Sequence, residues 1–262
     1  MDNYVHSLSI KNMNMNFIAI IPARYASTRF PGKPLALINN KPMIQHVYEQ
    51  SKKVFNDVFV ATDDKRIADT VAMFGGKYII TRDDHQSGTD RVFEAASKLK
   101  DNGVDFDVVV NIQGDEPFIH QKQLTALKEC FADTDTQIAT LIKPIDNADD
   151  LFDVNKPKVI TAINGNAIYF SRQTIPFIRG EERDNWKSKH KFYKHIGLYA
   201  YKFEALEVIS KLPQSSLEIA ESLEQNRWLE NNISIKTAIT DIETIGIDTP
   251  EDLAKANLQF SE

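Results

Sequence analysis

The stretch FIAIIPARYASTRFPGK, residues 17–33, joins an apolar run to a cationic loop. The run Phe17–Ile21 predicts a buried strand. The loop after it is basic and rich in small side chains: Ala23, Arg24, Ser27, Arg29 and Lys33. Cations and accessible backbone N–H groups at the C-terminal end of a strand suit a polyanion such as a nucleoside triphosphate. A basic surface loop is the alternative, and the rest of the chain has to decide between the two.

Strand-like and helix-like segments alternate through the first half of the chain. Strands are predicted at 17–21, 58–61, 78–80 and 108–112, and helices at 43–54, 65–73, 90–99 and 121–131. The run 108–112 is apolar apart from Asn111, as expected for a central strand that is buried on both faces. Such alternation predicts a parallel, right-handed, doubly wound sheet.

The pattern changes after residue 155. Two strand-like runs, 159–162 and 167–170, flank Asn164-Gly165-Asn166, which is a hairpin signal. The polar segment 179–191 predicts an exposed loop. Further strands are expected at 195–201 and 233–238, a long helix at 217–230, and a last helix at 250–258 that is capped by Thr249.

No Gly/Ser-rich linker divides the chain, so we predict one α/β domain over residues 17–262, built on a mostly parallel doubly wound sheet. A β-rich insertion at about 155–202 is a candidate lid or dimer surface. Residues 1–16 form a polar N-terminal extension that lacks a signal-peptide core.

Composition excludes several classes of function. The net charge of −6 argues against general nucleic-acid binding, which usually needs a basic excess. The single cysteine, Cys130, rules out an intrachain disulfide and fits a cytoplasmic location. No apolar stretch approaches the ~20 residues that span a bilayer, so no membrane insertion is expected.

The residues that follow each strand are the ones to examine for function, because ligands of open α/β sheets bind beyond the strands' C-terminal ends. The third strand leads into Ser87, Gly88, Thr89 and Arg91, at the start of a helix that we expect Thr89 or Asp90 to cap. Such a helix N-terminus can hold a base, a ribose or an acidic sugar; an ordinary polar loop is the alternative.

The fourth strand leads into Gln113-Gly114-Asp115-Glu116. Carboxylates at the rim of a sheet are costly to bury unless something pairs with them. Mg²⁺ would do so, since it binds aspartate and triphosphate oxygens together. An ordinary turn is the alternative. Asp248 lies outside the cap of the last helix and is a candidate for a second metal ligand, although sequence spacing does not show that it meets Asp115.

The predicted helix at 217–230 places Glu221, Glu224, Gln225 and Trp228 on one face. Either this face is solvated or it binds a polyhydroxylated substrate. His195, at the start of an apolar strand, is equally well a structural histidine or a ligand.

Eight motifs appear in order between about residues 20 and 255: PARYASTRFPGKPL, ATDD, DHQSGTDR, NIQGDEP, IYFSR, HIGLYAY, LEQ and GIDTPEDL. Together they resemble the 3-deoxy-manno-octulosonate (Kdo) cytidylyltransferase, or CMP-Kdo synthetase, family. The resemblance implies a nucleotidyltransferase fold and a soluble bacterial enzyme that is usually a dimer and uses Mg²⁺. It also implies the activation of Kdo with CTP, giving CMP-Kdo and pyrophosphate for lipopolysaccharide biosynthesis.

The resemblance also implies a role for each candidate residue. The catalytic set would be Arg24, Lys33, Asp115 and Asp248. The nucleotide would be bound by Ala23, Arg24, Ser27, Arg29, Lys33, Ser87, Gly88, Thr89 and Gln113. The acidic sugar would contact Arg91, His195, Tyr199, Glu224 and Gln225. Mg²⁺ would be held by Asp115 and Asp248.

One region departs from the family's usual pattern. Ser216 stands where we expect proline, and Asn226 where we expect leucine. Both positions border the inferred sugar site, so the 8-amino analogue of Kdo remains a rival substrate. A CMP-nonulosonic acid synthetase, a sugar-1-phosphate nucleotidyltransferase and a silent nucleotide-binding regulator also remain open. An NAD-binding module is disfavoured, because no G-x-G-x-x-G follows the first strand.

Overall fold

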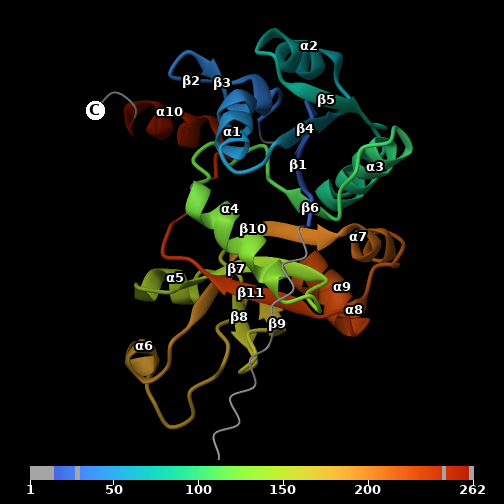
Figure 1. Cartoon of the computed structure of the whole chain (residues 1–262). Helices are drawn as coiled ribbons and strands as arrows, with labels where there is room; N and C mark the ends of the chain where they lie inside the picture. Colours follow the sequence, from blue (N-terminus) through green and yellow to red (C-terminus); the bar gives the residue numbers. More distant parts are fainter. Residues whose placement is uncertain (1–14, 27–29, 244–245, 260–262) are drawn as a thin grey trace, which may run out of the picture.

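A mixed β-sheet with helices on both faces forms the centre of the chain (Figure 1). The computed structural model describes residues 15–26, 30–243 and 246–259. Within these residues the large sheet has nine strands: β1 (Phe17–Ala23), β4 (Asp57–Thr62), β5 (Lys77–Ile80), β6 (Val108–Asn111), β7 (Ile138–Pro144), β8 (Lys158–Thr161), β9 (Ala167–Ser171), β10 (Tyr193–Lys202) and β11 (Ile235–Ile239). A separate small hairpin joins β2 (Leu37–Ile38) to β3 (Lys41–Pro42).

The strand order is β11-β7-β10-β6-β1-β4-β5, with β8 paired to β10 and β9 paired to β8. Strands β6, β1, β4 and β5 are parallel neighbours, and so are β11 and β7. β10 runs antiparallel to both β6 and β7. The mostly parallel sheet is therefore confirmed. β10 reverses direction because it follows the β8–β9 hairpin rather than a crossover helix, which parallel pairing requires.

Ten α-helices lie within the described residues: α1 (Met43–Lys52), α2 (Lys65–Met73), α3 (Gly88–Asp101), α4 (Gln121–Glu129), α5 (Ala148–Phe152), α6 (Trp186–Lys189), α7 (Phe203–Ser210), α8 (Ser216–Glu221), α9 (Glu224–Glu230) and α10 (Pro250–Gln259). α1, α2 and α4 cover one face of the sheet, and α3, α7 and α9 cover the other. The side chains of β1 alternate between the two faces of the sheet. Ile18 and Ile20 pack on the face covered by α3, α7 and α9, whereas Ala19 and Ile21 pack on the face covered by α1, α2 and α4.

The hairpin signal at Asn164-Gly165 is confirmed, because β8 and β9 pair antiparallel around it and Gly165 has a φ of 82°. Strand β7 was not predicted, although six of its residues form a buried run. Its apolar residues lie between two short polar segments.

The prediction of one helix over 217–230 is wrong. The helix breaks at Ser222, whose φ of 51° is left-handed, and this break separates α8 from α9. The guanidinium of Arg172 donates to the carbonyls of Glu221 (2.6 Å) and Ser222 (3.3 Å), and the Glu221 carboxylate accepts from Ser171 Oγ (2.6 Å). Contacts with the end of β9 therefore replace the helical hydrogen bonds at this point, so Glu221 does not share a helix face with Glu224.

The prediction that 179–191 is an exposed loop is confirmed for most of its side chains, but not for its backbone or for Trp186. This segment contains α6, and Trp186 in it is 5% exposed. The indole N–H donates to the carbonyl of Glu181 (3.0 Å), and the ring packs against Phe152 and Phe177. One large aromatic side chain was enough to bury part of a segment that is otherwise polar.

Among the helices that the structure describes, none is both long and apolar enough to cross a membrane.

Candidate active site

The ends of β1 and β6 come into close contact at the C-terminal edge of the sheet. An added Cβ at Gly114, which follows β6, would lie 2.9 Å from the carbonyl oxygen of Pro22 in β1. No side chain fits that distance, so glycine is required here. The close approach brings the loop that carries Asp115 beside the loop that carries Arg24 and Lys33.

Lys33 links the two predicted metal ligands. Its Nζ lies 2.7 Å from Asp115 Oδ2 and 3.1 Å from Asp248 Oδ1. Asp248 reaches this position because the N–H of Ile247 donates to the carbonyl of Asp115 (2.9 Å) and the Ile247 side chain is fully buried against Ile38. The two carboxylates, which are 133 positions apart in the sequence, therefore meet around one cation.

The donor set fits Mg²⁺. The described residues contain no group of three or more His, Cys, Asp or Glu side chains that could hold a metal. Two carboxylates are nevertheless what Mg²⁺ commonly takes from a protein when substrate phosphates and water complete its shell. Asp115 and Asp248 already share one cationic partner, so their spacing suits a small cation.

Glu116, next to Asp115, carries a buried carboxyl oxygen with no hydrogen-bond partner among the described residues. Burial, together with the charge of Asp115, raises the pKa of Glu116 to about 7. The sequence predicts carboxylates at this rim but no separate role for Glu116, because the extent to which a side chain is buried cannot be read from the sequence.

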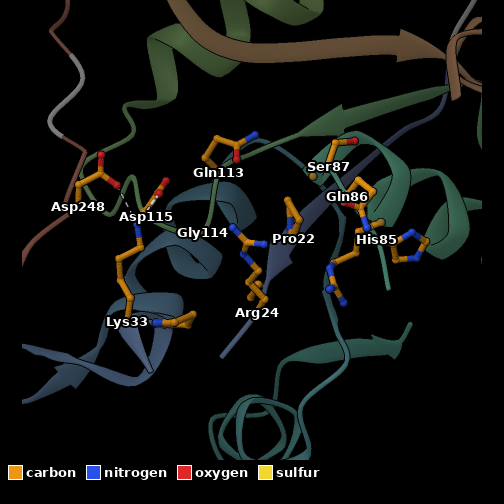
Figure 2. A pocket seen from close by; sticks show the side chains of 14 residues that line it. Pro22, Arg24, Lys33, His85, Gln86, Ser87, Gln113, Gly114, Asp115 and Asp248 are labelled. Atoms are coloured by element: carbon orange, nitrogen blue, oxygen red, sulfur yellow. Dashed lines mark hydrogen bonds and ion pairs between the residues drawn. The ribbon is translucent and has the colours of Figure 1, made fainter. Parts of the chain in front are cut away.

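A pocket extends from Lys33 to the loop before α3. Figure 2 shows Asp115, Asp248 and Lys33 at one side of it, Arg24 in the middle, and His85, Gln86 and Ser87 at the opposite side. Gly88 and Gln113 also line it. The predicted nucleotide-binding residues Ala23, Arg24, Lys33, Ser87, Gly88 and Gln113 are therefore brought together. Ser27 and Arg29 lie outside the described residues.

Ser87, not Thr89 or Asp90, is the N-cap of α3. Its Oγ accepts from the N–H of Asp90 (3.1 Å), and the Asp90 carboxylate accepts from the N–H of Ser87 (3.2 Å), which completes a capping box. Thr89 is buried and donates through its hydroxyl to Glu224 (2.7 Å), so it joins the start of α3 to α9.

Arg91, which we predict to contact the sugar, lies among the predicted nucleotide-binding residues. It lines the same pocket, and its guanidinium Nη1 lies 2.7 Å from Asp63 and 2.6 Å from Thr81 Oγ1. The role of Asp63 was missed, although its place directly after β4 was a usable signal.

His195 and Tyr199 of β10 lie beside Trp228 of α9. The ring centroids are 5.3 Å apart for His195 and Tyr199, and 5.2 Å apart for Tyr199 and Trp228. Several buried donors here have no hydrogen-bond partner of good geometry among the described residues: Tyr199 Oη, Tyr201 Oη, Gln225 Nε2 and Trp228 Nε1. Each unpaired buried donor costs about 1–3 kcal/mol.

Burial alters the ionisation of this cluster. It lowers the pKa of His195 to about 3, and the Nε2 atom lies 3.0 Å from the Thr140 hydroxyl. Burial also raises the pKa of Glu224, against the opposing effect of its hydrogen bond from Thr89. His195 is therefore a neutral imidazole near pH 7.

The two residues that depart from the family pattern, Ser216 and Asn226, both make hydrogen bonds within the chain. Ser216 begins α8 and donates to Glu230 (3.1 Å). Asn226 is fully buried; its Nδ2 donates to the carbonyl of Phe170 (3.0 Å) and its Oδ1 accepts from the Phe170 N–H (3.4 Å). Asn226 thus anchors α9 to β9.

Comparisons with known proteins show the family to which the chain belongs. A family profile described as cytidylyltransferase matches residues 18–237. Proteins of Parabacteroides distasonis and Bacteroides thetaiotaomicron, both named 3-deoxy-manno-octulosonate cytidylyltransferase, are 61% and 59% identical over 246 residues, covering 92% of this chain and 97% of each relative. A solved structure of CMP:2-keto-3-deoxy-manno-octonic acid synthetase complexed with CTP has a TM-score of 0.86 at 41% identity, covering 94% of this chain and 98% of that one. The chain belongs to the cytidylyltransferase family, among the 3-deoxy-manno-octulosonate cytidylyltransferases.

Proposed function

We propose that this enzyme transfers CMP from CTP to Kdo and releases pyrophosphate, as a cytoplasmic step of lipopolysaccharide precursor synthesis. The observation that carries the proposal is the meeting of Asp115, Lys33 and Asp248 at one end of a pocket lined by Arg24, Gln113 and the start of α3. A cationic group beside two carboxylates suits a triphosphate with its metal.

In the proposed reaction the anomeric hydroxyl of the sugar attacks the α-phosphorus of CTP, loses its proton and displaces pyrophosphate. Lys33 and Arg24 offset the charge that grows on pyrophosphate. Asp115 and Asp248 would hold Mg²⁺, which when bound would polarise the phosphorus and ease loss of the hydroxyl proton. Because two polyanions must be held together, positioning by these residues contributes more than a general base.

The sugar is proposed to bind beside β10 and α9. Gln225 and Trp228 each hold a buried donor without a hydrogen-bond partner among the described residues, and a polyhydroxylated acid supplies acceptors for such groups. His195, neutral near pH 7, would serve as a hydrogen-bonding group and not as a charged one.

Kdo is favoured over its 8-amino analogue because the two unusual residues are committed elsewhere. Both polar atoms of the Asn226 amide are hydrogen-bonded to the backbone of Phe170, and Ser216 is the first residue of α8. Neither offers the carboxylate that would favour an added ammonium group.

A pyrophosphate-release assay tests this function directly. With CTP and Mg²⁺, we expect turnover with Kdo at a kcat/KM at least tenfold above that for 8-amino-Kdo, and little turnover with UTP. Preference for the amino sugar would overturn the substrate, while CTP binding without any turnover would support a silent regulator. Turnover with a nonulosonic acid or a sugar 1-phosphate in place of Kdo would point to the other two enzymes.

A homodimer that forms through the insertion at about 155–202 is also proposed. Its apolar side chains Ile168 and Phe177 are 55% and 72% exposed, which favours burial against a second copy. We expect light scattering at micromolar concentration to give twice the chain mass, and Ile168→Glu to give a monomer. A monomeric parent protein would contradict this assignment.

A further inference from the structure

The wall of the pocket opposite Lys33 is a short loop, residues 82–87, that supplies His85, Gln86 and Ser87 (Figure 2). Its far end is fixed by the capping box between Ser87 and Asp90. The rest of the loop has no regular secondary structure. Something else must therefore fix His85 and Gln86 in place.

Glu94, on α3 and outside the residues that line this pocket, contacts both ends of the segment 82–85. Its carboxylate accepts from the backbone N–H of Arg82 at 3.1 Å and makes a short contact with His85 Nε2. Because an ionised carboxylate only accepts hydrogen bonds, this Nε2 carries a hydrogen that it donates. One side chain thus fixes the backbone at the start of the loop and the imidazole three residues later.

The surroundings of Glu94 keep it charged and oriented. The side chains of Glu94 and His85 are 17% and 6% exposed, and Lys98 Nζ lies 2.6 Å from the other carboxylate oxygen. Burial alone would raise the pKa of Glu94, but hydrogen bonds from Lys98, Arg82 and His85 lower it to about 2. The carboxylate is therefore ionised near pH 7.

We infer that Glu94 is a positioning residue for nucleotide selection, acting through His85 and the loop 82–87. The inference rests on the proposed function, in that CTP occupies this pocket. With the triphosphate at Lys33 and Arg24, its nucleoside end lies toward this loop. Glu94 then sets the distance between the loop and the nucleoside, and with it the preference for CTP over UTP.

Glu94→Gln tests the inference, because it keeps the shape of the side chain and removes the charge. We expect the Kd and KM for CTP to rise about tenfold, as for the loss of one charge-assisted hydrogen bond. The ratio of CTP to UTP use should fall, while kcat and the KM for the sugar change less than about twofold. The control Lys65→Met removes an exposed lysine that pairs with Asp69, away from this loop, and should leave the Kd for CTP within about twofold.

His85→Gln and the double variant show whether Glu94 acts through His85. If it does, the double variant should bind CTP no more weakly than the worse single variant. Full additivity, or an unchanged Kd for CTP in folded Glu94→Gln, would overturn the inference. A lower melting temperature and kcat at constant Kd would show a role in stability alone. If the parent protein itself failed to bind CTP, the proposed function would fail first, and calorimetry without sugar separates that case.

Discussion

Asp115→Ala is expected to lower kcat by about a hundredfold or more while the protein stays folded. Asp115 is one of the two carboxylates that meet around Lys33, and its removal leaves Asp248 as the one remaining member of the proposed pair of Mg²⁺ ligands. Its side chain is 33% exposed, so truncation opens no core cavity. The loss should therefore appear in turnover rather than in the free energy of unfolding.

The measurement is pyrophosphate release at saturating CTP and sugar, with circular dichroism and melting temperature to confirm folding. Raising Mg²⁺ should recover part of the activity if the variant binds the metal weakly. Asp69→Ala is the matched control, because Asp69 forms only an exposed pair with Lys65, and it should leave kcat unchanged. A folded Asp115→Ala enzyme with near-normal turnover would remove the metal assignment.

The strands that build the site were predictable because their signals are local. The apolar runs of β1, β4 and β6 and the polar residues after them were enough to place Lys33 and Asp115 at one edge of the sheet. The second carboxylate was different. Asp248 meets Asp115 through the Ile247 backbone and the burial of Ile247, which are contacts between distant segments that no sequence period encodes.

The break between α8 and α9 was unpredictable for a related reason. The apolar and polar residues of 217–230 have helical spacing throughout. Arg172, some fifty positions earlier, nevertheless donates hydrogen bonds to the carbonyls of Glu221 and Ser222. This tertiary contact overrides local propensity. The break lets Glu221 contact β9 while Glu224 contacts Thr89 on the opposite side. The prediction of a single helix therefore failed at the point that separates Glu221, which holds β9, from Glu224, which lies beside the candidate site.

Lys33→Ala is expected to raise the KM for CTP about 10- to 100-fold, with a smaller effect on the KM for the sugar. In the structure the ammonium group offsets the charges of Asp115 and Asp248, and toward CTP it would offset those of the phosphates. Its removal takes away a charge-assisted contact worth about 1.5–3 kcal/mol. It also leaves the two carboxylates to repel each other, so the metal-free protein should lose some stability while Mg²⁺ restores it.

Lys33→Met separates the charge from the packing, because the Lys33 side chain is only 13% exposed and methionine retains much of its apolar stem. If the ammonium is what matters, Met and Ala should raise the KM for CTP equally, whereas a packing role would spare Met. Lys41→Ala, which removes an outer lysine paired to Glu49, should change neither KM. Unchanged CTP kinetics in both Lys33 variants would leave the loop as an ordinary basic surface, since a cation that binds the triphosphate cannot be lost without weakening its binding.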